Sequence, residues 1–175
     1  MTWDLNKLKA QMAFEDAFRT VAESRGADSP PAVLLVDRGV MDTKAFVSEE
    51  AWDEMLSVHG WDEEQFLRRY DSVIHLVSTA IGAEAHYSGA NNHARRETVE
   101  EARAQDSQIR DAWVQHPNFR IISNRCDGFD AKLSKVKEAV CEVAGLPMPV
   151  GGTNKQRGLV KGGFHDEYLA ALVDG

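Results

Sequence analysis

The chain has 175 residues, of which 43% are hydrophobic and 27% are charged, with 13 glycines and 5 prolines. This composition is typical of one globular α/β or α-helical domain, and it excludes the disordered, collagen-like and disulfide-scaffold classes. The net charge of −8 argues against a broad nucleic-acid-binding surface.

Targeting signals and cysteine usage point to the interior of the cell. The first residues show no apolar core of a signal peptide, and no run reaches the ~20 apolar residues of a membrane-spanning helix. The two cysteines, Cys126 and Cys141, are too few for a disulfide framework. We therefore expect a cytoplasmic protein with reduced thiols, no transmembrane segment and no nucleic-acid partner.

The first half of the chain predicts three helices and one buried strand. Residues 5–21 carry apolar side chains at helical spacing, and the Gly- and Pro-containing stretch 23–31 ends that pattern. Residues 32–36 read Ala-Val-Leu-Leu-Val, a continuous apolar run typical of a parallel strand buried on both faces. Ser48 and Asp62 each precede acidic and then apolar residues, and so predict two further helix starts.

The second half predicts two strands, at residues 73–77 and 119–122, and two helices. Thr98 begins a capping box, and Asp130 is predicted to cap the last amphipathic helix. His75 lies inside a predicted strand, where we expect a hydrogen-bonded core histidine. The alternation of helices and buried strands predicts a layered α/β domain with a parallel sheet.

Ligands of open parallel sheets bind at the carboxyl ends of the strands, and three predicted loops have that placement. In the first, Asp37 and Arg38 directly follow the run 32–36, and Asp42 comes soon after. A carboxylate in this position suits a Mg²⁺–nucleotide site, as a water-mediated metal ligand or as a base for an attacking hydroxyl. The alternative is an Asp that only caps the following turn.

The other two loops offer cationic and amide side chains. Arg95 and Arg96 lie at the end of a loop rich in Gly, Ala, Asn and His, and such arginines can close over phosphates. Alternatively, they pair with the glutamates that follow them. Asn124 comes after the last predicted strand and offers a donor and an acceptor to a nucleotide base, unless it serves only the turn before the last helix.

A set of short motifs, taken in order, resembles one family. The motifs are Asp37-Arg38-Gly39-x-x-Asp42, Arg69-Tyr70-Asp71-Ser72-Val73-Ile74-His75-Leu76, Gly82-Ala83-Glu84, Asn91-Asn92, Arg95-Arg96-Glu97-Thr98, His116-Pro117 and Gly145-Leu146-Pro147. Across residues 5–150 they resemble the AAA-type P-loop domain shared by NadR and the TRPL translocation defect proteins. The eukaryotic translocation-defect branch is the more similar of the two.

This resemblance implies a three-layer, nucleotide-kinase-like P-loop domain over residues 1–146, with a parallel sheet and Mg²⁺ with GTP or ATP as cofactor. The implied catalytic residues are Asp37, which also holds the metal, Arg38 beside it, and Asp42 on the acceptor side. The implied nucleotide-binding residues are the lid arginines Arg95 and Arg96, and Asn124 at the base.

The sequence departs from the family at its phosphate cradle. It contains neither G-x-x-x-x-G-K-[ST] nor G-x-G-x-x-G, so the family's first strand and Walker A loop are absent. That strand is central in kinase-like P-loop sheets, between the strands at 32–36 and 73–77. Residues 147–175 predict a linker and a stub that resembles the entry to a CYTH-like domain.

We therefore expect an incomplete P-loop domain with weak or no nucleotide binding by itself and no turnover. One alternative is a non-catalytic interaction module on the same fold, which binds a protein partner or phosphoinositides through Arg68, Arg69, Arg95 and Arg96. Another is a small-molecule kinase whose phosphate cradle comes from a partner chain.

Overall fold

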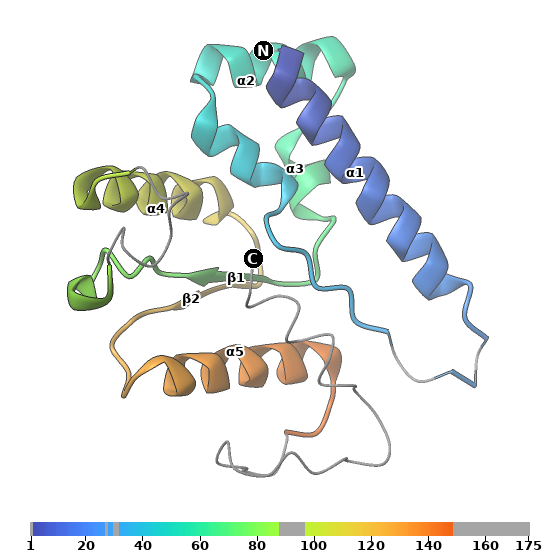
Figure 1. Cartoon of the computed structure of the whole chain (residues 1–175). Coiled ribbons are helices and arrows are strands. Elements are labelled where there is room, and N and C mark those ends of the chain that lie inside the picture. Colours follow the sequence, from blue (N-terminus) through green and yellow to red (C-terminus); the bar gives the residue numbers. More distant parts are fainter. Residues whose placement is uncertain (1, 27, 30–31, 88–96, 149–175) are drawn as a thin grey trace.

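The computed structural model describes residues 2–26, 28–29, 32–87 and 97–148, and its elements are arranged as shown in Figure 1. In chain order they are α1 (Thr2–Glu23), the 3-10 helix η1 (Val40–Phe46), α2 (Glu49–His59), α3 (Glu63–Leu67), β1 (Val73–Leu76), the 3-10 helix η2 (Glu84–His86), α4 (Val99–Trp113), β2 (Phe119–Ile122) and α5 (Phe129–Ala144).

The sheet of the described residues consists of two parallel strands. β1 pairs with β2 so that Val73 lies opposite Phe119 and Leu76 lies opposite Ile122. Figure 1 shows α4 on one side of this pair and α5 on the other. The mixture of helices with a parallel strand pair agrees with the α/β class that the sequence predicts.

Local capping chemistry explains where three helices begin. The hydroxyl of Ser48 accepts a backbone hydrogen bond at the start of α2, and the carboxylate of Asp62 accepts one from Gln65 at the start of α3. At α4, Thr98 and Glu101 form a complete capping box, in which each side chain bonds the other residue's backbone N–H. The three predicted helix starts are confirmed.

The predicted cap of the last helix is wrong. Gly128, with a φ of 88°, is the N-cap of α5, and Asp130 lies inside the first turn. Glycine adopts such a positive φ without steric cost, so the chain enters the helix before it reaches Asp130. The carboxylate of Asp130 is still favourable there, because acidic groups near a helix N-terminus interact well with its dipole.

The predicted strand at 32–36 is also wrong. This segment is not a strand, and residues 33–36 form no backbone hydrogen bonds with other described residues. Leu34, Leu35 and Val36 are 45%, 44% and 37% exposed. A strand needs a neighbouring backbone edge at hydrogen-bonding distance, and a groove separates this segment from β1.

The main hydrophobic core lies among the helices. Its fully buried side chains come from α1, η1, α2 and α3, namely Leu8, Val40, Met41, Trp52, Met55 and Phe66. Trp113, at the end of α4, packs into the same cluster. This core fixes η1 between α1 and α4, and η1 directly follows Asp37 and Arg38.

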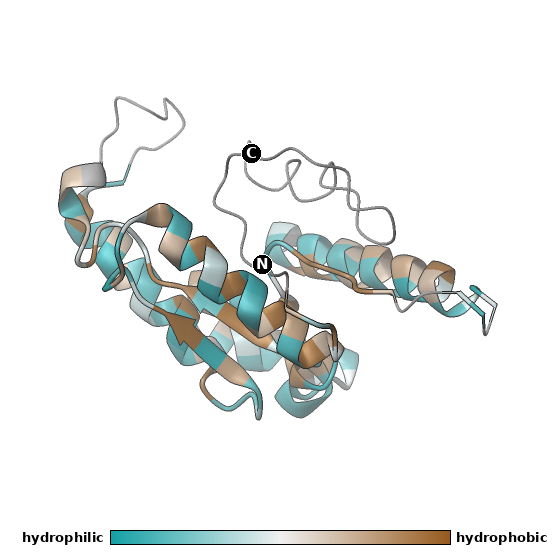
Figure 2. Cartoon of the chain, turned by 90° about the horizontal axis from the view of Figure 1, so that it is seen from below, coloured by the Kyte–Doolittle hydropathy of each residue, from teal (hydrophilic) through white to brown (hydrophobic). Residues whose placement is uncertain are grey.

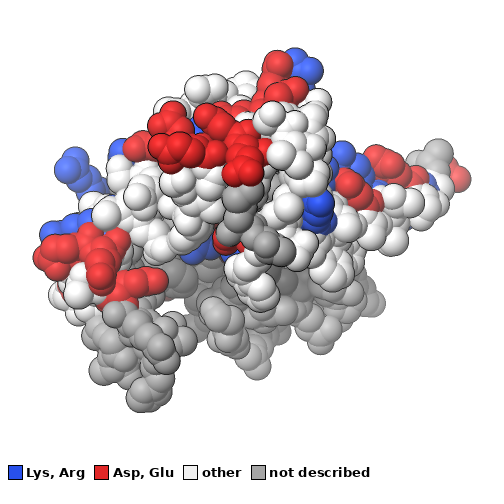
Figure 3. Space-filling model, turned by 90° about the horizontal axis from the view of Figure 1, so that it is seen from above, with Lys and Arg blue, Asp and Glu red and all other residues white. Residues whose placement is uncertain are grey.

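The molecular surface reflects the excess of acidic residues. Figure 3 shows clusters of acidic side chains with few basic side chains among them on one face. Every helix in the described part of the chain is too short or too polar to cross a membrane.

Candidate functional site

Asp37, Arg38 and Asp42 line a single groove of about 370 Å³. Lys7 and Gln11, both from α1, line the same groove. We call this site the Asp37 groove. It brings together the carboxylates of Asp37 and Asp42 and the cationic side chains of Lys7 and Arg38. These side chains come from α1, from the turn after residue 36 and from η1.

A strained turn shapes the entrance of the Asp37 groove. Arg38 has a φ of 72° and is the only non-glycine residue with a positive φ among the described residues. This conformation costs about 1–3 kcal/mol. The side-chain amide of Gln11 donates a hydrogen bond to the carbonyl of Arg38 and so supports the turn.

Asp42 is buried, and both of its carboxylate oxygens have partners. The indole N–H of Trp113 donates to Oδ1 at 2.5 Å, and Arg38 Nη1 lies 3.4 Å from Oδ2. The side chain of Arg38 stays 58% exposed. Asp42 therefore holds one nitrogen of an arginine that lines the groove and is otherwise largely exposed.

Asp37 is the carboxylate of this groove that can accept a cation. It is exposed, and no described residue hydrogen bonds or ion-pairs with its side chain. No group of three or more His, Cys, Asp or Glu in the described residues could hold a metal ion without further ligands. Mg²⁺ in nucleotide sites needs only one or two carboxylates, because phosphate oxygens and waters complete its shell. One free carboxylate therefore fits this cofactor.

A buried polar network beneath the groove holds the turn in place. The Tyr70 hydroxyl accepts from the Val40 N–H and donates to Glu15, both at 2.8 Å. Burial, together with the bond to Glu15, raises the pKa of Tyr70 well above its ordinary value. Arg69 Nε donates to the same carboxylate at 3.0 Å. The network therefore joins α1 to the first residue of η1.

Arg68 and Arg69, which the sequence suggests as phosphoinositide-binding residues, form ion pairs with acidic side chains. The side chain of Arg69 is 13% exposed and pairs with Glu15 and Asp16. Arg68 pairs with Glu64. Arg95 and Arg96 lie outside the described residues. The described arginines of this set therefore already have acidic partners.

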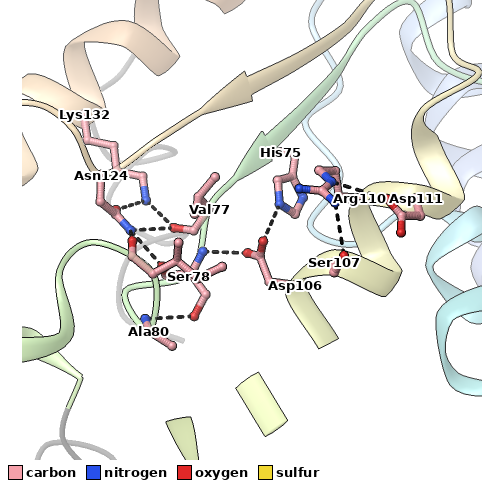
Figure 4. A network of polar contacts seen from close by, with 11 residues as sticks. His75, Val77, Ser78, Ala80, Asp106, Ser107, Arg110, Asp111, Asn124 and Lys132 are labelled. Atoms are coloured by element: carbon pink, nitrogen blue, oxygen red, sulfur yellow. Dashed lines mark hydrogen bonds and ion pairs between the residues drawn. The ribbon is translucent and has the colours of Figure 1, made fainter. Parts of the chain in front are cut away.

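Asn124 lies at the carboxyl ends of β1 and β2 and does not line the Asp37 groove. Its side-chain N–H groups donate to the carbonyls of Val77, Ser78 and Ile81 at 2.7–3.2 Å. Lys132 Nζ donates to Asn124 Oδ1 and to the carbonyl of Val77, both at 2.7 Å (Figure 4). Partial burial lowers the pKa of Lys132. In this structure the amide fastens the turn that follows β1.

His75 is a buried, hydrogen-bonded histidine, as expected from its place in a strand. Its Nε2 lies 3.3 Å from Asp106 Oδ2, and Asp106 Oδ1 accepts from the Ser78 N–H at 2.7 Å (Figure 4). Asp106 interrupts the apolar face of α4, and this network gives it partners. The two side chains connect α4 to the end of β1.

Sequence reasoning missed the residues that reach the Asp37 groove from a distance. Lys7 and Gln11 lie in a helix whose pattern indicates only packing, and Trp113 lies 71 positions from its acceptor Asp42. The sequence also does not indicate that Gly39 packs closely against Trp113. No local signal identifies these partners.

Comparison with known proteins assigns the chain to a family. A family model described as an AAA domain matches residues 2–130, which is about three quarters of the chain. No curated protein and no solved structure matches the chain. The matched region includes Asp37, Arg38, Asp42 and Asn124. The chain therefore belongs to the AAA-domain family, whose members are nucleotide-binding domains of the P-loop type.

Proposed function

We propose that the chain forms part of a Mg²⁺–nucleotide-binding domain, and that the Asp37 groove is the metal and phosphate side of its site. One observation carries this proposal. Asp37, Arg38 and Asp42 converge on one groove in which the Asp37 carboxylate has no partner among the described residues, close to the cations of Arg38 and Lys7.

Each side chain has a distinct role in this proposal. Asp37 binds Mg²⁺ directly or through a water, and the bound metal neutralises phosphate charge. Arg38 offers guanidinium donors to phosphate oxygens, because such contacts are bidentate and charge-assisted. Asp42 positions Arg38 and supports the acceptor side of the site.

The finer assignments follow the resemblance to NadR and the TRPL translocation defect proteins. We assign residues 1–146 to a three-layer P-loop domain, and residues 147–175 to a linker and a C-terminal stub. Arg95 and Arg96 act as lid residues over the phosphates of GTP or ATP. Asn124 borders the base through its Oδ1, which also accepts from Lys132.

The proposed affinity is weak, because the sequence contains no Gly-rich loop with a Lys to hold the β-phosphate. Two-dimensional NMR of the tryptophan indoles measures such binding without requiring high affinity. The Trp113 N–H bonds Asp42 and reports on the groove, whereas the exposed Trp3 serves as an internal control.

We expect Mg²⁺ with GTP or ATP to shift the Trp113 signal with half-saturation in the range of about 1 mM or above, and to leave Trp3 unchanged. Replacement of Mg²⁺ by Mn²⁺ should broaden the Trp113 signal. Asp37→Ala should abolish both effects, whereas the exposed Asp53→Ala on α2 should keep them. Submillimolar affinity that Asp37→Ala removes would contradict weak binding, and an unresponsive Trp113 would contradict the site.

A further inference from the structure

One of the two cations of the Asp37 groove has no carboxylate partner among the described residues. Lys7 lines the groove and is exposed, and it forms no ion pair or hydrogen bond with any residue that the structure describes. The other cation, Arg38, already bonds Asp42 through Nη1 at 3.4 Å. The three N–H donors of the Lys7 ammonium are therefore available to a ligand.

The packing of α1 determines where Lys7 lies. The next residue, Leu8, is completely buried in the core and anchors this part of the helix. Gln11 lies one turn further along the same side of α1 and bonds the carbonyl of Arg38, so Lys7 and Gln11 line the groove together. Figure 2 shows hydrophilic residues interspersed with hydrophobic ones along α1, which begins at the N label.

The ring of Phe46 holds the Lys7 ammonium at the groove. Phe46 is the last residue of η1 and also lines the groove, and Lys7 Nζ lies 5.8 Å from the centre of its ring. The negative face of an aromatic ring attracts a cation at this distance. A ring carries no net charge, in contrast to a carboxylate, so Phe46 orients the ammonium without neutralising it.

The charges of the groove favour a chain of phosphates over a neutral group. Its charged side chains are two carboxylates and two cations, whose formal charges cancel. Mg²⁺ held by Asp37 would leave the groove positively charged. A phosphate chain can contact the metal with one oxygen and a cationic side chain with another, whereas a sugar or a base brings no negative charge to either.

We propose that Lys7 binds the phosphate chain of the nucleotide in the Asp37 groove, and that Phe46 is the positioning residue that holds its ammonium there. This inference rests on the proposed function and gives α1 a direct part in ligand binding. Because Lys7 contacts phosphate, inorganic triphosphate engages it in the same way as GTP does.

Titrations of the full chain with GTP and with inorganic triphosphate, each with Mg²⁺, test the role of Lys7 through the Trp113 indole signal. We expect Lys7→Met to weaken both ligands about tenfold. Lys7→Arg keeps the cation and should retain most of the affinity. Lys9→Met is the matched control, because it removes the same charge from an exposed position of α1 that does not line the groove. It should change the affinity less than about twofold.

Substitutions of Phe46 test the positioning role. Phe46→Leu should weaken both ligands about two- to fivefold, which corresponds to the loss of an exposed cation–π contact. Phe46→Trp should restore the affinity, because an indole attracts a cation more strongly. A larger loss for GTP than for inorganic triphosphate in Phe46→Leu would show that the ring stacks on the base, and would overturn the positioning role.

The outcomes separate this inference from the proposed function. Equal effects of Lys7→Met and Lys9→Met, in a chain whose response Asp37→Ala still abolishes, would overturn the inference and leave the proposed function intact. A native chain whose Trp113 signal responds to neither ligand would overturn both. Circular dichroism checks that each variant keeps the fold, which we expect because Lys7 and Lys9 are exposed.

Discussion

Replacement of Gly39 by alanine tests the packing that holds the Asp37 turn. An added Cβ would lie 2.4 Å from Trp113 Cζ2 and 2.6 Å from Cη2, whereas carbon atoms in contact are normally about 3.5–4.0 Å apart. The ring cannot withdraw easily, because it is buried, packs edge-on against Tyr70 and is hydrogen bonded to Asp42. We expect Gly39→Ala to cost about 2–3 kcal/mol, in the upper part of the range for overpacked cores.

Urea denaturation followed by tryptophan fluorescence measures this free energy of unfolding, and the melting temperature should fall by about 4–12 °C. Gly26→Ala is the matched control, because its Cβ meets no atom within 4 Å. It should be neutral or stabilising by up to about 1 kcal/mol. Trp113→Phe removes both clashing atoms, so Gly39→Ala in that background should cost less than about 1 kcal/mol. A Gly39→Ala cost below about 0.5 kcal/mol in the native background would refute the reasoning.

Substitutions at three further positions probe the polar networks. Folded Tyr70 keeps its proton at a pH where the unfolded chain, with a pKa of about 10, loses it. Stability should therefore fall above about pH 10, and Tyr70→Phe should remove this part of the slope in urea titrations; equal slopes would be the contrary result. Asn124→Ala should lower the free energy of unfolding by about 1–3 kcal/mol in thermal melts, because three carbonyls and Lys132 lose a partner. Asp42→Leu should cost about 1–3 kcal/mol because it strands the buried Trp113 N–H, whereas Asp42→Asn keeps an acceptor and should cost less than about 1 kcal/mol; similar costs for both variants would contradict this account.

The helices could be predicted because their signals are local. Ser48, Asp62 and Thr98 each meet backbone N–H groups within three residues, so the capping pattern is complete in a few letters of sequence. β1 and β2 were also predictable, since each finds the other as a parallel partner. Asp130 shows the limit of this approach. Its pattern predicts an N-cap, but α5 already begins at Phe129, after Gly128, and the local composition does not indicate the positive φ of that glycine.

The apolar run 32–36 shows where local reasoning fails. Its residues suit a buried strand, but strand formation depends on a neighbour that the run itself does not encode. In the structure, the position beside it is a groove, and its leucines remain exposed.

The sequence alone is sufficient to predict the α/β class, three of the helix starts, the parallel strand pair and the position of Asp37 and Arg38 after an apolar run. Which of the candidate side chains are free to bind depends on the tertiary packing. Arg69 is paired with Glu15, 54 residues away, and Asn124 is bonded to carbonyls more than 40 residues away, whereas Asp37 has no described partner. Such distant pairs depend on how α1 and the loops pack, and the periodicity of a single sequence carries no information about that packing.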